Sequence, residues 1–226
     1  MIAFDPFGWT ARVLPEKWLH RLIRAGAIAV FCLFLFRRIQ QYDDFLFKPL
    51  WLVETLIYLV LIAVFVLRVN PLDRAKGARE IVLPLMGGLL PFALLTSAPN
   101  PAVWRHSVVL YGVFGWMTAA TLLTIWGMWV MRRSFSITVE ARVLVTGGPY
   151  RWLRHPIYAG EILTAAAVML WRFSLANLVL MIAFVLIQLL RSRWEEQKLT
   201  RVFPDYAGWA STSWWFWRIK PAPSTQ

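Results

Sequence analysis

Residues 107–131 read SVVLYGVFGWMTAATLLTIWGMWVM and contain no charged side chain. As an α-helix, these 25 residues rise about 37 Å, which exceeds the ~30 Å hydrocarbon core of a bilayer. An open strand cannot satisfy its backbone polar groups in lipid, whereas a helix satisfies them internally. This stretch therefore predicts a transmembrane helix.

Five other apolar runs surround it, at residues 22–36, 50–67, 81–97, 157–171 and 174–190. The composition is typical of a membrane protein, since 59% of the residues are hydrophobic and 16% are charged, against ~45–50% and ~25% in soluble domains. We therefore predict an all-α, polytopic integral membrane bundle of about six transmembrane helices. The first and fifth runs are short for a bilayer core, and Pro84 and Pro91 should kink the third.

The basic residues indicate an orientation. The formal net charge is +12, but the lysines and arginines lie between the apolar runs and form no basic tail, so nucleic acid is not an expected partner. With six spans, 19 of the 24 lysines and arginines fall on one side of the membrane and 5 on the other. The positive-inside rule then places both termini in the cytoplasm, and in a bacterium the membrane would be the inner one. No cleavable signal peptide is expected, because no small-residue cleavage pattern follows the first run.

The last two runs form a predicted helical hairpin. Only Arg172 and Phe173 separate them, so the two helices must be antiparallel neighbours. The hairpin brings residues 154–158 and 191–196 to the same cytoplasmic end. We expect two regions, a four-span membrane region at residues 1–131 and a C-terminal region at residues 132–226 that carries the chemistry and a cytoplasmic tail.

The first chemical motif is TGGPYRWLRHPIYAGE at residues 146–161. Its two glycines and Pro149 predict a tight turn that a ligand can approach closely. Pro156 suits the first turn of the following helix, where free backbone N–H groups favour an anionic group such as a carboxylate. The alternative is a basic interfacial loop with tyrosine and tryptophan in the headgroup belt.

The second motif is RSRWEE at residues 191–196. Through the hairpin it sets two carboxylates beside Arg154 and His155, an arrangement that suits a zwitterionic amino-acid group with a ribose. The alternative is a solvated helix face on which Arg191 and Glu195 pair at a spacing of four. Glu161 lies one turn inside the fifth run, where a charge is unfavourable enough to indicate a functional role or a partner. The lone Cys32 and the absence of HExxH and CxxC patterns give no reason to expect a metal site.

Together these stretches, RSFSITVEARVLVTGGPYRWLRHPIYAGEIL at 133–163 and RSRWEEQKLTRVFPDYAGW at 191–209, resemble the isoprenylcysteine carboxyl methyltransferase family. That family belongs to a wider group with phospholipid and small-thiol membrane methyltransferases. The resemblance implies an S-adenosylmethionine-dependent methyltransferase with its cofactor pocket at the cytoplasmic end of the hairpin. It assigns cofactor binding to Gly148, Pro149, Tyr150, His155, Pro156, Tyr158, Gly160, Glu195 and Glu196, with Arg154 inside the same motif. The family's Arg-x-x-Pro close is matched only loosely, at 218–221.

The predicted reaction is methyl transfer to a lipophilic or membrane-delivered acceptor, with a small molecule or lipid and the surrounding membrane lipids as partners. A carboxylate or thiolate acceptor needs no general base. An amine or phenol does, and Glu161 or Glu196 would then be the candidate. Arg154 and Arg191 are expected to orient an anionic acceptor. Two alternatives remain open, a sterol-reductase-like membrane reductase that uses NADPH and a non-enzymatic membrane transporter or adaptor.

Overall fold

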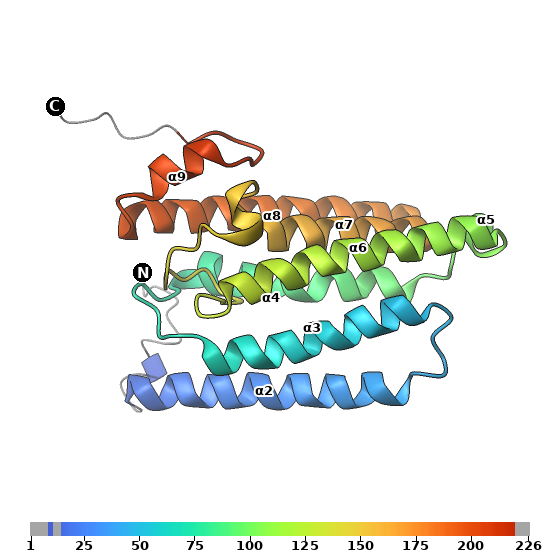
Figure 1. The fold of residues 1–226 in the computed structure, drawn as a ribbon, viewed down its shortest axis with the longest axis horizontal. Coiled ribbons are helices and arrows are strands. Elements are labelled where there is room, and N and C mark those ends of the chain that lie inside the picture. The colour runs from blue at the N-terminus through green and yellow to red at the C-terminus, as the bar shows by residue number, and fades with distance from the viewer. Residues whose placement is uncertain (1–8, 11–14, 220–226) are drawn as a thin grey trace.

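The computed structural model describes residues 9–10 and 15–219, and in this part of the chain regular structure is entirely helical. Six helices form the body of the molecule: α2 (Glu16–Gln40), α3 (Lys48–Leu67), α4 (Gly77–Ala93), α6 (Ser107–Met131), α7 (Pro156–Trp171) and α8 (Leu175–Val202). Four short elements join or follow them: η1 (Leu94–Thr96), α5 (Pro101–Trp104), η2 (Gly148–Arg151) and α9 (Tyr206–Thr212). Figure 1 shows the six long helices lying side by side. The all-α polytopic bundle is thus confirmed.

Five of these helices are long and apolar enough to cross a membrane, and α7 is shorter. The first run, which looked short, lies within a helix of 25 residues because the helix continues into basic residues at both ends. At 16 residues, α7 rises only about 24 Å, less than the ~30 Å hydrocarbon core of a bilayer. One continuous helix, α4, contains both Pro84 and Pro91.

The helices alternate in direction. The beginnings of α2, α4 and α7 and the ends of α3, α6 and α8 all lie at one end of the bundle, on the left in Figure 1, and α9 lies there too. This is the end at which the sequence places most lysines and arginines. The orientation of that end in a membrane stays a prediction.

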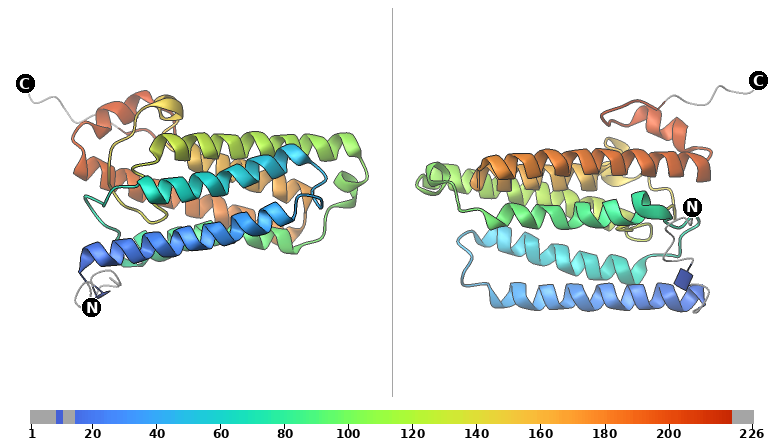
Figure 2. Two further views of the ribbon diagram at one scale, coloured as in Figure 1. Left: turned by 60° about the horizontal axis from the view of Figure 1, so that its bottom comes forward. Right: turned by 180° about the vertical axis from the view of Figure 1, so that it is seen from behind.

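Helices from the first half of the chain pack directly on those of the second. α3 contacts α6, and α4 contacts α8, which the view from behind shows running alongside it (Figure 2). The predicted regions 1–131 and 132–226 therefore share one bundle. The most extensive helix contact is between α6 and α7, and Gly160 of α7 lies against the backbone of Ala120 and Thr124 there.

The connection between α6 and α7, residues 132–147, is irregular but pinned. Its backbone pairs with the connection between α3 and α4, since Ala141 N–H donates to Asp73 O at 3.0 Å. Its other anchor is Lys198 of α8, which is 2% exposed. The Lys198 ammonium donates to Glu80 Oε2 at 2.6 Å, Arg74 O at 2.9 Å and Val139 O at 3.1 Å. A buried ammonium with three acceptors holds α4, α8 and this connection together.

Two of the basic residues in the charge count, Arg12 and Lys220, lie outside the described residues.

Candidate functional site

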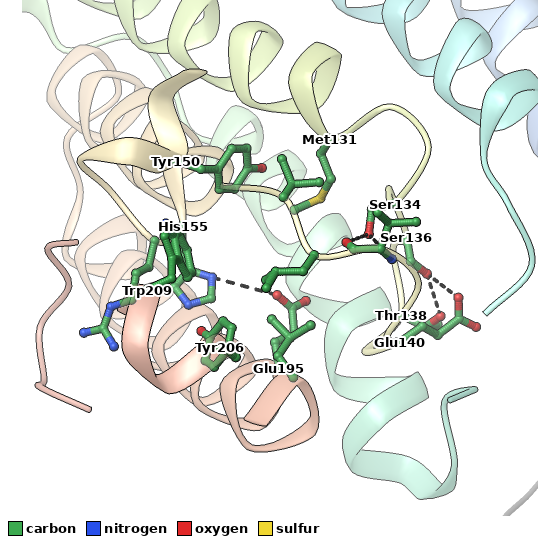
Figure 3. Close-up of a pocket in the computed structure, with 15 residues that line it drawn as sticks. Met131, Ser134, Ser136, Thr138, Glu140, Tyr150, His155, Glu195, Tyr206 and Trp209 are labelled. Atoms are coloured by element: carbon green, nitrogen blue, oxygen red, sulfur yellow. Dashed lines mark hydrogen bonds and ion pairs between the residues drawn. The ribbon is translucent and has the colours of Figure 1, made fainter. Parts of the chain in front are cut away.

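A cavity opens at the end of the bundle where α6 ends and α7 begins. Its empty space is about 570 Å³, the open mouth included. Figure 3 shows His155, Glu195, Tyr206 and Trp209 on one side of it and the connection from Ser134 to Glu140 on the other. The lining residues are Met131, Ser134, Ser136, Thr138, Glu140, Val143, Leu144, Val145, Tyr150, Arg154, His155, Glu195, Leu199, Tyr206 and Trp209.

The turn before α7 requires its glycine. Gly148 has φ +58°, and a Cβ atom there would come within 2.8 Å of Val130 Cγ2. Both the left-handed backbone and the contact with α6 exclude a side chain. The tight turn predicted from the sequence is confirmed as η2. It buries Tyr150, whose hydroxyl donates to Gly127 O at 3.3 Å.

Two tyrosines of the cavity wall are neutral phenols. Burial raises the pKa of Tyr150 well above its ordinary value, and the charge of Glu195 raises it further. Burial likewise raises the pKa of Tyr206, with the charge of Glu196 adding to the effect. Both side chains therefore offer the cavity a ring face and a hydroxyl, and neither serves as a base at neutral pH.

Glu195 faces the cavity. Its Oε2 lies 3.9 Å from His155 Nδ1, the contact drawn as a dashed line in Figure 3, and its Oε1 accepts from the Tyr158 hydroxyl. The rings of His155 and Tyr158 stack, with centroids 5.4 Å apart and planes 10° from parallel. A carboxylate oriented by a phenol and an imidazole is therefore available to a ligand in the cavity.

Glu196, its neighbour, points the other way, because successive residues of a helix are ~100° apart. It is 3% exposed and does not line the cavity. Its Oε1 lies 3.1 Å from both Arg154 Nη1 and His155 Nε2, and its Oε2 accepts from the Trp217 indole N–H. The Glu196 carboxylate thus anchors Arg154 and His155 from behind.

A second polar cluster extends from the site toward the body of the bundle. The Arg191 guanidinium lies over the Tyr158 ring, 4.7 Å from its centroid, and donates to Ile137 O at 2.8 Å. Arg191 also donates to Gln188 at 3.3 Å, and the Gln188 amide donates to the Glu161 carboxylate. The Glu161 carboxyl group, which the sequence places inside a span, therefore has a partner. No direct Arg191–Glu195 ion pair occurs among the described residues, because Tyr158 lies between the two.

The hairpin brings the two predicted motifs together, as the sequence indicates, but their residues occupy different places. Four of the predicted site residues line the cavity: Tyr150, Arg154, His155 and Glu195. Gly148, Pro149 and Pro156 shape the turn and the start of α7, and Gly160 packs on α6. Glu196 lies behind the cavity, and Glu161 and Arg191 lie on its membrane side. The cofactor and catalytic roles of all these residues stay predictions.

Sequence reasoning did not assign the wall formed by residues 131–145, nor Leu199, Tyr206 and Trp209. The wall is held at the cavity by Lys198, by Arg191, which donates to Ile137 O, and by backbone pairing with the α3–α4 connection. The sequence carries a weak signal for the other three. They lie in the family-like stretch just after the acidic pair, Leu199 on α8 and Tyr206 and Trp209 on α9.

Part of the chain matches the model of a known family. Residues 100–206 match the phospholipid methyltransferase family. The matched region begins at α5 and includes α6, so it takes in the fourth predicted span as well as the hairpin and both motifs. No curated protein sequence matches the chain. This region is similar to a phospholipid methyltransferase domain, a family in the wider group of isoprenylcysteine and phospholipid membrane methyltransferases, and the resemblance predicted from the motifs is confirmed.

Proposed function

We propose that the protein transfers a methyl group from S-adenosylmethionine to an acceptor carried by a lipid. The observation that supports this most is the cavity itself. It opens between the two motifs inside the matched family region, and its wall combines a carboxylate, two cationic or imidazole groups and aromatic rings.

The lining suits S-adenosylmethionine. Glu195 offers oxygens to an α-amino group or to ribose hydroxyls, and His155 with Arg154 offers donors to an α-carboxylate. The faces of Trp209, Tyr206 and Tyr150 suit an adenine ring. When bound, the cofactor supplies a methyl group on a positively charged sulfur, which a nucleophile displaces in line. The chain's own contribution would be alignment of the two reactants at ~3–3.5 Å in a site with little water.

The membrane side of the cavity supports a lipid acceptor. Behind Tyr158 the cluster of Arg191, Gln188 and Glu161 leads from the cavity into the body of the bundle. We propose that Arg191 orients an anionic group of the acceptor, whereas Arg154, which lines the cavity beside His155, faces the cofactor. For an amine acceptor, Glu161 is the better candidate for the general base, because Glu196 is enclosed by three partners.

The direct test is ligand-induced stabilisation of the purified protein. S-adenosylhomocysteine at 100 times its Kd should stabilise the folded state by about 2.7 kcal/mol, because a ligand that binds only the native state raises its stability by mass action. NADPH at the same concentration should leave the unfolding temperature unchanged. Stabilisation by NADPH and not by S-adenosylhomocysteine would favour the reductase alternative, and stabilisation by neither would leave the site without its proposed cofactor.

The acceptor class needs its own assay. In nanodiscs at fixed lipid partitioning, affinity should rise about fourfold for each CH₂ added to the acceptor chain, since burying a CH₂ contributes roughly 0.8 kcal/mol. Acceptors with one chain length and a headgroup amine, carboxylate or thiol then identify the methylated atom. A flat chain-length series would indicate a water-soluble acceptor.

A further inference from the structure

The chain after α9 lies across the back of the candidate site. Residues 214–217, Trp-Trp-Phe-Trp, lie outside any helix, and we call them the strap. Trp214 pairs with the loop before α7, donating to Trp152 O at 2.8 Å and accepting from Arg154 N–H at 3.1 Å. The strap follows the matched family region, which ends at residue 206.

The four aromatic side chains of the strap alternate between more exposed and more buried positions. Trp214 and Phe216 are each 59% exposed, whereas Trp215 is 4% exposed. Trp215 packs on the His155 ring with centroids 4.8 Å apart, and its indole N–H donates to Ser192 Oγ at 3.1 Å. The strap therefore presents one face to the candidate site and the other to its surroundings.

The second inward residue, Trp217, contacts the charged pair behind the cavity. Its indole N–H donates to Glu196 Oε2, and its backbone carbonyl accepts from Arg154 Nη2. One residue thus contacts both members of the Arg154–Glu196 pair, whose side chains are 1% and 4% exposed. A buried carboxylate needs donors for both oxygens, and Trp217 is the side-chain donor to Oε2 in the described part of the chain.

We propose that Trp217 is a positioning residue for the cofactor site. By fixing Glu196 Oε2, it turns Oε1 toward Arg154 and His155 and so orients the two groups that line the cavity. The inference rests on the proposed function, because the cavity must bind S-adenosylmethionine or its product for this orientation to matter. Without the indole donor, the Glu196 carboxylate can rotate, and the donors that face the cavity lose their alignment.

The test is calorimetric titration of the full-length protein with S-adenosylhomocysteine. Trp217→Phe keeps an aromatic ring and removes the N–H donor, and affinity should fall about tenfold, which corresponds to ~1.4 kcal/mol. Trp214→Phe is the matched control, since it makes the same chemical change on the outward face, and its affinity should stay within about twofold of the original chain. Equal affinities for the two variants would overturn the inference.

A double-mutant cycle separates positioning from general loosening of the fold. Glu196→Gln leaves one acceptor oxygen, and we expect that oxygen to face Arg154 and His155, so the Trp217 indole loses its acceptor. If Trp217 acts through Glu196, adding Trp217→Phe to Glu196→Gln should change affinity by less than about twofold. A full tenfold loss in that background would show that Trp217 acts by another route and would reject the proposal.

A measurement on the unmodified chain covers the case in which a variant fails to fold. Saturating S-adenosylhomocysteine should slow amide hydrogen exchange across residues 214–217, because a ligand on the cavity side stabilises the groups that the strap holds. Binding in the titration without slower exchange in the strap would overturn the inference while the proposed function stands. No binding in the titration would overturn the proposed function, and this inference with it.

Discussion

Replacing Gly160 with alanine should separate α6 from α7. A Cβ atom at this position would lie 2.2 Å from Thr124 Oγ1, 2.8 Å from Ala120 O and 2.9 Å from Thr124 N. The hydroxyl can rotate away, but the two backbone atoms cannot move unless the helices shift. The contact between α6 and α7 is the most extensive of the bundle, so the shift disturbs much packing at once.

The magnitude follows from two opposing effects. Overpacking a close helix contact costs about 3 kcal/mol at the upper end of the usual range, and alanine returns about 1 kcal/mol of helix propensity relative to glycine. The net destabilisation is about 2 kcal/mol, or roughly 4–8 °C in unfolding temperature for a chain of this size. Because α7 begins at Pro156 next to His155, affinity for S-adenosylhomocysteine should fall as well.

The assay is thermal unfolding in lipid nanodiscs, followed by tryptophan fluorescence. Gly112→Ala is the matched control, since Gly112 lies on α6 and a Cβ atom there has no neighbour within 4 Å. That variant should be neutral or slightly stabilised. Equal stability of Gly160→Ala and Gly112→Ala would refute the predicted backbone clash between α6 and α7. The prediction also fails if Thr124→Ala restores full stability to Gly160→Ala, because a side-chain clash alone would then explain the effect.

Three other predictions concern the buried ammonium of Lys198, the cavity wall and the topology. Lys198→Met should destabilise the protein by roughly 3 kcal/mol in chemical or thermal unfolding, because it leaves the Glu80 carboxylate without its 2.6 Å partner. Lys76→Met is the control: its ammonium lies 4.0 Å from the Asp73 carboxylate at the surface, so the variant should change stability by less than about 1 kcal/mol. Glu195→Gln should weaken S-adenosylhomocysteine binding ~5-fold or more with little change in unfolding temperature, whereas Glu196→Ala should also lower stability because it leaves Arg154 buried without its counter-ion. Reporter fusions at residues 40, 75 and 100 should read outside, inside and outside, and an inside signal at 40 would contradict the cytoplasmic N-terminus.

Much of the fold follows from local sequence patterns. A charge-free run such as 107–131 has one stable structure in lipid, so its helix is predictable without any knowledge of its neighbours. The same holds for the hairpin, because two residues between the last runs leave only an antiparallel arrangement. The limits of the helices were harder to predict, as α2 shows: polar residues at a membrane surface extend a helix without adding to its hydropathy.

The sequence predicts which motifs meet at the candidate site, but not the direction in which each side chain points. The sequence placed Glu195 and Glu196 beside Arg154 and His155 as one acidic pair. Only the rotation of α8 about its axis decides that Glu195 faces the cavity and Glu196 faces the strap, and the packing of α8 against α4 and α7 sets that rotation. A period that can be read along one helix gives no information about which neighbour packs against it.

By itself, then, the sequence determined the class of protein, the number of helical runs, the end of the bundle at which the candidate site lies and the family that its motifs resemble. Each of these depends on hydrophobicity, charge or turn residues that act over a few positions. The tertiary structure decided which side chains share the cavity. Packing brings together segments that are far apart in the chain: the wall at 131–145 reaches the cavity, Lys198 reaches Glu80, and Trp217 reaches Glu196. Contacts of that kind depend on how whole helices pack, and no local pattern encodes them.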